Sequence, residues 1–156
     1  MVGEFLFNGR RLFVVNLHLR SKGGDDPIFG RRQPRKTAST ARRTSQAGVV
    51  AGFVEGILRL DADAGVVVLG DLNDFEKTEP LQVLGAAGLE DLLLRAPEED
   101  RYTYVYTGIS QILDHVLVSE ALTLDAEVDA VHVNADNPAG VRASDHDPVV
   151  VRLTIP

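Results

Sequence analysis

Residues 65–74 read Gly-Val-Val-Val-Leu-Gly-Asp-Leu-Asn-Asp, an apolar run that ends in closely spaced polar residues. A short run of β-branched and aliphatic residues between two glycines predicts a fully buried strand. Asp71 and Asn73 follow at the end of that strand, where side chains reach the edge of a sheet. Taken alone, a stretch such as Asp71-Leu72-Asn73 is more often an ordinary Asx turn. The stretch therefore predicts a buried strand whose tip is either a turn or part of a site.

Two apolar runs precede this strand and are joined at Asn8-Gly9. That dipeptide favours a tight hairpin because both residues tolerate positive φ. The second run extends from about Arg11 to Leu19 and carries His18 at its end. Residues 20–36 are rich in Gly, Asp, Pro and Arg, which predicts a long loop, and loops of that length in a small domain are usually functional or mobile.

A helix is predicted from Thr37 to about Leu60, because small or apolar residues recur there at helical spacing. These residues are Ala38, Ala41, Ser45, Val49, Phe53 and Leu60. Gly48, Gly52 and Gly56 weaken the helix, but their four-residue spacing places them on one stripe that another backbone could approach closely.

The second half of the chain is dominated by strands. A short helix is predicted at 79–88, ended by Gly88. Four strands follow, at about 101–107, 111–118, 126–133 and 148–154, and a loop covers 134–147. Helices follow strands only in the first half, so we expect an α/β (α+β) domain, a mixed or antiparallel sheet with flanking helices, over residues 1–156 as a single domain.

Composition describes a globular chain and excludes several classes of protein. The 156 residues are 44% hydrophobic, and no apolar run approaches the length that spans a bilayer. Residues 1–20 do not resemble a signal peptide. The chain contains no cysteine, so a metal would have to be held by oxygen or by histidine nitrogen. Localisation stays open.

The net charge of −7 is unevenly distributed. Residues 20–43 hold eight basic residues against two acidic ones, a local charge of +6, so the rest of the chain carries −13. A basic segment on an acidic body predicts contact with a phosphate-rich ligand, although a solubilising loop would look the same. The candidate phosphate-binding residues are Arg20, Lys22, Arg31, Arg32, Arg35 and Arg42.

Polar residues recur where the predicted strands begin or end. His18, Asp71, Asn73, Asp114, Asp145 and His146 all hold such positions. Strand ends on one edge of a sheet converge, so these residues could build one pocket. A lone histidine such as His18 is more often a hydrogen-bonded structural residue. Asp114 is more informative, because an acid in an apolar strand needs a partner, and a histidine is the natural one.

Four stretches carry a family resemblance. They are Asn16-Leu17-His18-Leu19, Gly70-Asp71-Leu72-Asn73-Asp74, Leu113-Asp114-His115-Val116 and Ser144-Asp145-His146-Asp147-Pro148. In this order they resemble motifs of the endonuclease/exonuclease/phosphatase superfamily, whose fold is DNase I-like, and residues 18–30 are similar to a bacterial, often secreted, nuclease branch.

The resemblance implies roles for these residues. Asp145 would bind a divalent metal, Mg²⁺, Mn²⁺ or Ca²⁺. Asp71 would orient or deprotonate the attacking water, and Asn73 would hydrogen-bond the charge that grows on phosphorus. His146, oriented by Asp114, would act as acid–base or as a cation, and His18 would contact the phosphate or protonate the leaving oxygen. His115 and Asp147 are interpreted as turn or supporting residues.

The resemblance also implies that part of the domain lies outside this chain. Members of the family have an N-terminal half that supplies a metal-binding glutamate and a second sheet, and Glu4 stands in the wrong context to be that glutamate. We therefore expect a partial DNase I-like sandwich whose exposed apolar face favours a homodimer or pairing with the missing N-terminal half.

The favoured function is a metal-dependent phosphodiester hydrolase, a nuclease acting on DNA or RNA. Two alternatives remain. One is a phosphatase acting on lipid or sugar phosphates, because the motifs do not select the substrate. The other is a catalytically incomplete module that binds only phosphate, a metal or a partner.

Overall fold

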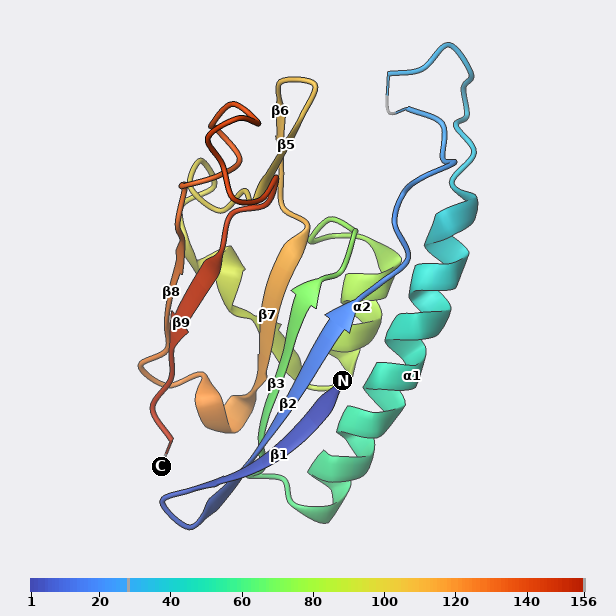
Figure 1. Ribbon diagram of the computed structural model, residues 1–156. Coiled ribbons are helices and arrows are strands. Elements are labelled where there is room, and N and C mark those ends of the chain that lie inside the picture. The colour runs from blue at the N-terminus through green and yellow to red at the C-terminus, as the bar shows by residue number, and fades with distance from the viewer. Residues whose placement is uncertain (28, 156) are drawn as a thin grey trace.

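A five-stranded mixed sheet organises the chain, in the order β1-β2-β3-β7-β4 (Figure 1). The structure, a computed structural model, describes residues 1–27 and 29–155. β2 and β3 run parallel and the other neighbours run antiparallel, which confirms the expected mixed sheet. The five strands are β1 Val2–Phe7, β2 Arg10–His18, β3 Gly65–Asp71, β4 Leu89–Asp91 and β7 Asp114–Ser119.

Helices and two small strand pairs flank this sheet. The helices are α1 Ala38–Leu60, α2 Glu79–Ala86 and the short 3-10 helices η1 Leu92–Arg95 and η2 Glu120–Leu122. The strand pairs are β5 Tyr104–Tyr106 with β6 Ile109–Gln111, and β8 Glu127–Ala130 with β9 Val149–Arg152. None of the helices in the described part of the chain has both the length and the apolar character needed to cross a membrane.

Two local backbone features fix how the strands meet. The hairpin between β1 and β2 turns at Asn8 and Gly9, with φ of 50° and 79°, as predicted. Gly70 has a φ of 125°, and a Cβ there would stand 2.1 Å from the carbonyl oxygen of Leu17 on β2. Only glycine allows β2 and β3 to approach this closely at the end that carries His18 and Asp71.

The two helices cover one face of the sheet (Figure 1). The core beneath them joins Val15, Val66 and Val68 of the strands to α1 and α2. The helix at 37–60 is confirmed, but its buried side is not the stripe of small and apolar residues that the spacing suggested. Ser39, Arg43, Ala47, Ala51 and Val54 are buried instead.

The predicted stripe of α1 faces solvent. Val49 and Phe53 are exposed, and a Cβ at Gly48 or Gly52 would meet no heavy atom of the described chain within 4 Å. No backbone therefore approaches the glycine stripe within the described residues. Ala47, Ala51 and Val54 pack instead in one cluster with apolar side chains of β2 and β3. Arg43 is buried with them because it bonds to the buried Asp74.

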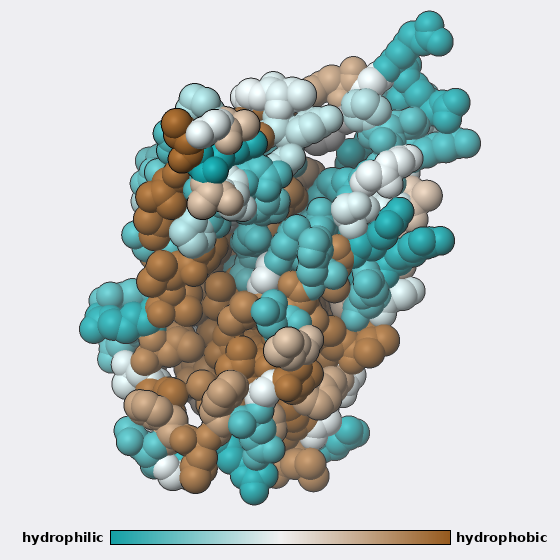
Figure 2. Space-filling view, viewed as in Figure 1, coloured by the Kyte–Doolittle hydropathy of each residue, from teal (hydrophilic) through white to brown (hydrophobic). Residues whose placement is uncertain are grey.

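The opposite face of the sheet is only partly covered. The β8–β9 pair packs over β7 and η1, where Val67, Val116 and Val118 are buried. Towards β1, the face stays open, with Phe5 and Phe7 exposed and Leu12 only partly buried. Figure 2 shows apolar side chains gathered over this face. We call the residues Phe5, Phe7, Leu12, Val14 and Leu69 the open apolar face.

Several strand boundaries differ from those predicted. The strand predicted at 111–118 does not form as one piece: Gln111 is the last residue of β6, and β7 begins at Asp114. The strand expected at 126–133 ends at Ala130, since backbone N–H groups of residues 133–135 turn to the Asp147 carboxylate. β5 and β9 are shorter than the predicted 101–107 and 148–154, and the three-residue β4 was not predicted.

Candidate active site

The sheet register places three of the predicted residues side by side. His18 on β2 pairs with Asp71 on β3, and Asp71 pairs with Asp114 on β7. Residues that pair across neighbouring strands point to the same face of the sheet. We call His18, Asp71 and Asp114 the polar row. The row lies at the strand tips on the same face as Val14, Leu69 and Val116, which is the face that the helices do not cover.

His146 joins this row from the loop before β9. Its Nδ1 lies 2.6 Å from Asp114 Oδ2, and an isolated bridge pairs it with Tyr104 of β5. The Tyr104 ring lies 4.7 Å from the imidazole, centroid to centroid. The carboxylate fixes the proton on Nδ1, so Nε2 is the ring nitrogen left for a ligand. The predicted pairing of Asp114 with a histidine is therefore present, over 32 residues of sequence.

Asp71 is held from two sides. Its Oδ1 accepts a hydrogen bond from the backbone N–H of Asn73 at 2.8 Å, and its Oδ2 accepts one from Asn73 Nδ2 at 3.0 Å. His18 Nε2 lies 3.4 Å from the same Oδ2, while the His18 side chain is 73% exposed. The Asx turn is therefore present, and it fixes the orientation of the Asp71 carboxylate within the polar row.

The side chain of Asn73 is already hydrogen-bonded within the protein, and its predicted role at the phosphate stays a prediction. Asn73 adopts a left-handed conformation with φ of 52°, and its side-chain amide also donates to the carbonyl oxygen of Leu19. Both amide hydrogens thus face protein oxygens. A contact between Asn73 and a phosphoryl oxygen would require one of these bonds to break, so in this arrangement Asn73 positions Asp71.

The surroundings of Asp71 and His146 raise the pKa of both groups. Burial raises the pKa of the Asp71 carboxyl, and the Asp114 charge beside it adds to the rise, against the lowering effect of the Asn73 backbone hydrogen bond. The hydrogen bond to Asp114 raises the pKa of His146, with burial acting the other way. Asp71 is thus a better proton acceptor than an ordinary aspartate, and His146 holds its proton more firmly than an ordinary histidine.

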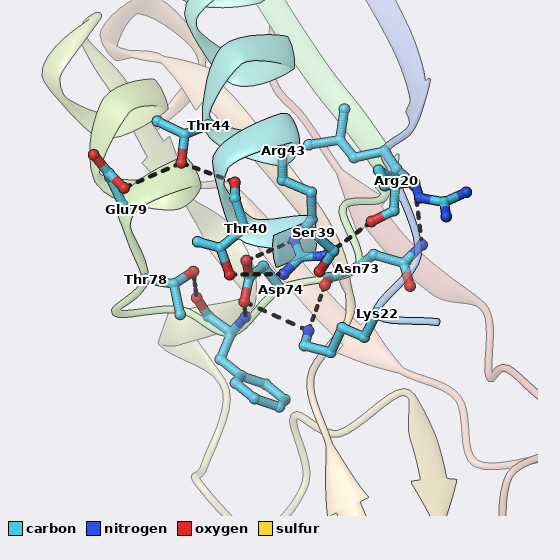
Figure 3. A network of polar contacts seen from close by, with 12 residues as sticks. Arg20, Lys22, Ser39, Thr40, Arg43, Thr44, Asn73, Asp74, Thr78 and Glu79 are labelled. Carbon is cyan, nitrogen blue, oxygen red and sulfur yellow. Dashed lines mark hydrogen bonds and ion pairs between the residues drawn. The ribbon is translucent and has the colours of Figure 1, made fainter. Parts of the chain in front are cut away.

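A buried ionic network supports the site from the helix side (Figure 3). Arg43 on α1 is 1% exposed, and its Nε donates to Asp74 Oδ2 at 2.7 Å. Its NH1 donates to the Ser39 hydroxyl and to the carbonyl oxygen of Arg20. Asp25 accepts hydrogen bonds from the backbone N–H and hydroxyl of Ser39. Arg43 therefore ties α1 to the loop that follows β2 and to the residue after Asn73.

Lys22 lies in this network and not in solvent. Its ammonium group donates to the carbonyl oxygen of Asn73, lies 3.5 Å from Asp74 Oδ1, and sits 4.1 Å from the centre of the Phe75 ring. Burial lowers the pKa of Lys22 to about 8, although the Asp74 charge opposes the change. The expected contact of Lys22 with a phosphate would compete with these partners.

The other candidate phosphate-binding residues are solvent-exposed. Arg31, Arg32, Arg35 and Arg42 extend from the loop at 20–36 and the start of α1. Arg20 is exposed as well, while its backbone N–H donates to Gln46. Arg32 also lies 3.9 Å from Asp26. Their positions are compatible with phosphate contacts, which stay a prediction.

His115 and Asp147, which flank the motifs, belong to separate buried networks. His115 Nδ1 lies 2.6 Å from Asp91 Oδ2, and its Nε2 lies 3.0 Å from the carbonyl oxygen of Asp74. Both ring nitrogens face acceptors, so the charged imidazolium fits this environment. Burial would lower the pKa of His115, but the Asp91 and Asp74 hydrogen bonds outweigh it and raise the pKa. The backbone of Asp74, beside Asn73, is thereby fixed.

Asp147 holds the loop that carries His146. Its Oδ1 accepts hydrogen bonds from the backbone N–H groups of residues 133–135, and its Oδ2 lies 3.0 Å from His132 Nδ1. These bonds lower the pKa of Asp147 despite its burial. Asp147 thus fixes the backbone next to His146 from the opposite side to Asp114.

The residues present do not assemble a complete metal site. Within residues 1–27 and 29–155, no three His, Asp or Glu side chains are grouped so that they could hold an ion. Asp71 and Asp114 are engaged by Asn73 and His146, and Asp145 stands exposed at the edge of the site. Asp145 is one available oxygen ligand, and one ligand does not define a metal centre.

Sequence reasoning missed two parts of this site. Arg43 stood among seven other basic residues of 20–43, and nothing in the pattern marked it as the buried one. Tyr104 and Tyr106 lie beside the row and line a pocket there. The alternation Tyr-Thr-Tyr-Val-Tyr at 102–106, directly before the Asp114 motif, was the available signal for an aromatic wall.

Comparison with protein families matches this geometry to a known group. The model of the "Endonuclease/Exonuclease/phosphatase family" matches residues 4–146, a range that includes the polar row and His146. The chain belongs to the endonuclease/exonuclease/phosphatase family. The resemblance carried by the four motifs is thereby confirmed, and the family is one of hydrolases that act on phosphodiester bonds. No curated protein matches this sequence.

Solved structures of the same fold are similar to this one at low sequence identity. Truncated TDP2 from Caenorhabditis elegans matches with a TM-score of 0.69 and 18% identity over 96% of this chain and 56% of its own. Sphingomyelinase C from Streptomyces griseocarneus gives 0.63 and 18%, over 97% and 56%. The human nocturnin catalytic domain, with bound sulfate, gives 0.60 and 18%, over 94% and 49%.

These likenesses establish the DNase I-like fold of the chain, as predicted. The chain spans about half the length of each of these three structures. One of the three is named a sphingomyelinase, so the fold does not select a nucleic acid over a lipid.

Proposed function

We propose that this chain hydrolyses phosphodiester bonds in nucleic acid. The observation that carries the proposal is the register of β2, β3 and β7, which sets His18, Asp71 and Asp114 in one row, with His146 bonded to Asp114. Family membership supports the reaction class. The exposed arginines of the loop at 20–36 support a polyanionic substrate.

The roles follow from the position and the proton affinity of each group. Asp71, with its raised pKa, takes a proton from water as the water oxygen bonds to phosphorus. His146 presents Nε2–H to a phosphoryl oxygen, and its positive charge, held by Asp114, stabilises the charge that develops there. The bond from phosphorus to the leaving oxygen breaks, and the exposed His18 supplies the proton to that oxygen.

A divalent metal remains a proposal for this chain. Asp145 is the residue we propose as its ligand, with Mg²⁺ the expected ion and Mn²⁺ or Ca²⁺ as alternatives. Because the described residues form no complete site, none of the steps above is assigned to the metal. Hydrolysis with Mg²⁺ and after chelation tests this part separately.

Hydrolysis of bis(p-nitrophenyl) phosphate and of single-stranded DNA tests the function. We expect cleavage by the unaltered chain and its loss in His146→Ala and Asp71→Asn. Asp125→Asn is the matched control, because Asp125 is exposed and has a φ of 54°, which asparagine tolerates well. Full activity in His146→Ala would refute the assignment.

Nucleic acid as substrate predicts a strong dependence on salt. If Arg31, Arg32 and Arg42 neutralise phosphates, the logarithm of the DNA association constant falls linearly with the logarithm of salt concentration, with a slope of about −0.7 per contact for single strands. Each arginine-to-glutamine change then reduces that slope. Binding that is indifferent to salt would remove the support for a polyanion.

A second candidate function is a non-catalytic module that binds phosphate, a metal or a partner. The observation that favours it is that, in the part of the chain that the structure describes, Asp145 belongs to no group of three possible metal ligands. A chain that binds DNA or Mg²⁺ yet cleaves no phosphodiester under any metal would support the module. A phosphatase acting on lipid or sugar phosphates is tested by the same assay with those substrates.

A further inference from the structure

A pocket of about 590 Å³ opens beside Asn73 and His146. It lies between the loop at 20–36 and the β5–β6 hairpin, next to the polar row and His146. Its volume is in the range of sites that hold a small molecule or one residue of a polymer. The residues used below are Lys22, Arg35, Phe75, Tyr104, Tyr106 and Gln111, all of which line it.

Aromatic rings form two of its walls. Tyr104 and Tyr106 alternate along β5 and so share a face of that strand, with ring planes 12° apart and centroids 6.3 Å apart. Tyr106 is 57% exposed, so much of its ring is open to a ligand although it also packs beside Tyr104. Phe75 lines the same pocket, with the Lys22 ammonium over its ring.

The position of Tyr104 connects this wall to the chemistry. Its ring contacts His146, whose Nε2 faces the reacting phosphate in the proposed function. A flat ring stacked on the tyrosine wall therefore lies next to the reacting group. That is the place of the base in the nucleotide that carries the scissile phosphate.

The polar groups of the pocket favour a nucleobase over a hydrocarbon chain. Arg35 supplies positive charge, Lys22 is bonded to Asn73 and Asp74, and the Asp25 and Asp26 carboxylates of the lining are bonded to Ser39 and to the Lys36 backbone. The Gln111 side chain offers both a donor and an acceptor. An acyl chain in this space would desolvate these groups without offering a hydrogen bond. A base offers faces to the rings and polar edges to the side chains, and its phosphate offers charge to Arg35.

The walls are held in place before any ligand binds. The loop is anchored by Asp25 to Ser39, by the Arg20 backbone to Arg43, and by Lys22 to the Asn73 carbonyl oxygen. The other wall is the hydrogen-bonded β5–β6 hairpin. A preformed pocket binds without the cost of ordering its walls.

We propose that this pocket binds an unpaired nucleobase of the nucleotide whose phosphate is cleaved. The inference rests on the proposed function and narrows its substrate to single strands, ends or flipped-out nucleotides, because a base within a duplex is stacked on both faces and cannot enter. Tyr104 and Tyr106 stack on the base, and Arg35, an exposed cation of the lining, supplies positive charge beside its phosphate.

The chain carries its own spectroscopic probe for this binding. It contains no tryptophan, and its three tyrosines are Tyr102, Tyr104 and Tyr106. Tyr102 is bonded through its hydroxyl to Asp136, and it is not among the residues that line the pocket. Stacking of a base therefore changes the emission of two of the three tyrosines.

The test is a fluorescence titration with a short oligothymidylate and with an abasic oligomer of the same length. We expect the base-containing strand to quench the tyrosines and to bind about 5- to 100-fold more tightly, as stacking on an aromatic residue predicts. Tyr106→Ala should abolish the preference, Tyr106→Phe should keep it, and Tyr102→Phe should leave it unchanged. Equal affinity for the two oligomers, or quenching only by sphingomyelin vesicles, would overturn the inference.

Hydrolysis of bis(p-nitrophenyl) phosphate separates this inference from the function on which it rests. If the chain cleaves that ester yet shows no preference for bases, the base pocket is refuted and the hydrolase stands. If it prefers bases but cleaves no phosphodiester, the hydrolase is refuted and the base pocket stands.

Discussion

The bond between His146 and Asp114 gives the sharpest quantitative prediction. The two side chains are 25% and 21% exposed, and 2.6 Å separates their atoms. A hydrogen bond to an ionised carboxylate is worth about 1.5–3 kcal/mol, and each pKa unit by which Asp114 raises the pKa of His146 adds about 1.4 kcal/mol once His146 is protonated. The coupling energy of the pair should therefore change with the charge of His146.

The sign of the pH dependence follows from the raised pKa of His146. The folded protein binds this proton more tightly than the unfolded chain, so the stabilisation is fully present below the unfolded pKa of histidine and is lost as pH rises through the folded one. A double-mutant cycle of Asp114→Asn and His146→Gln should give about 1.5–3 kcal/mol at about pH 9. At about pH 6 it should give more, by about 1.4 kcal/mol for each unit by which Asp114→Asn lowers the pKa of His146.

Urea unfolding followed by tyrosine fluorescence measures each corner of this cycle. In parallel, NMR titration of the four histidines should show a lower pKa for His146 in Asp114→Asn. A cycle of Asp145→Asn with His146→Gln is the control, because Asp145 acts on His146 only through its charge. A coupling energy of zero, or one that does not change with pH, would refute the reasoning.

Three further predictions address the catalytic row, the buried network and the open apolar face. The pH profile of kcat/KM should be bell-shaped: activity falls at acid pH as Asp71 is protonated, above the ordinary aspartate pKa, and at alkaline pH as His146 loses its proton, above the ordinary histidine pKa. A profile that lacks either the acid or the alkaline fall would contradict it. Arg43→Met should cost about 3 kcal/mol of unfolding free energy, the low end for a broken buried ion pair, because the buried Asp74 and Asp25 carboxylates lose Arg43 while Lys22 still faces Asp74. Arg42→Met on the exposed side should cost little, and equal losses in urea unfolding would count against the network. The open apolar face should make copies of the chain associate at high concentration, and Phe5→Glu should reduce this, so sedimentation of the unaltered chain as a monomer at all concentrations would exclude it.

The sequence predicted elements well where local chemistry determines the backbone. The Asn8-Gly9 turn and the buried strand at 65–70 depend on positive φ and on a run of β-branched residues, and both are present. It failed where the decision lies in tertiary contacts. Which side of α1 is buried depends on how the helix packs against β2 and β3. β4 has only three residues, too few to form a recognisable sequence pattern.

The candidate site divides in the same way. The convergence of the strand tips could be predicted, because polar residues recur at the ends of predicted strands and because Asp114, an acid in an apolar strand, needs a partner such as His146. The burial of Arg43, the inward direction of Lys22 and the engagement of Asn73 with Asp71 could not, because each depends on groups more than fifteen residues away or on the rotation of one amide. The local charge made Lys22 a candidate for phosphate binding, and in the structure its ammonium group faces Asp74.

The four histidines offer a test of whether the strand tips form one phosphate site. Diethyl phosphate, a simple phosphodiester anion, is titrated into the chain while the histidine signals are followed by NMR. The proposed arrangement predicts that His18 and His146 shift together with a single Kd, while His115 and His132, which are bonded to Asp91 and Asp147, stay unchanged. Shifts of His18 and His146 with different Kd values, or no shift in either, would contradict it.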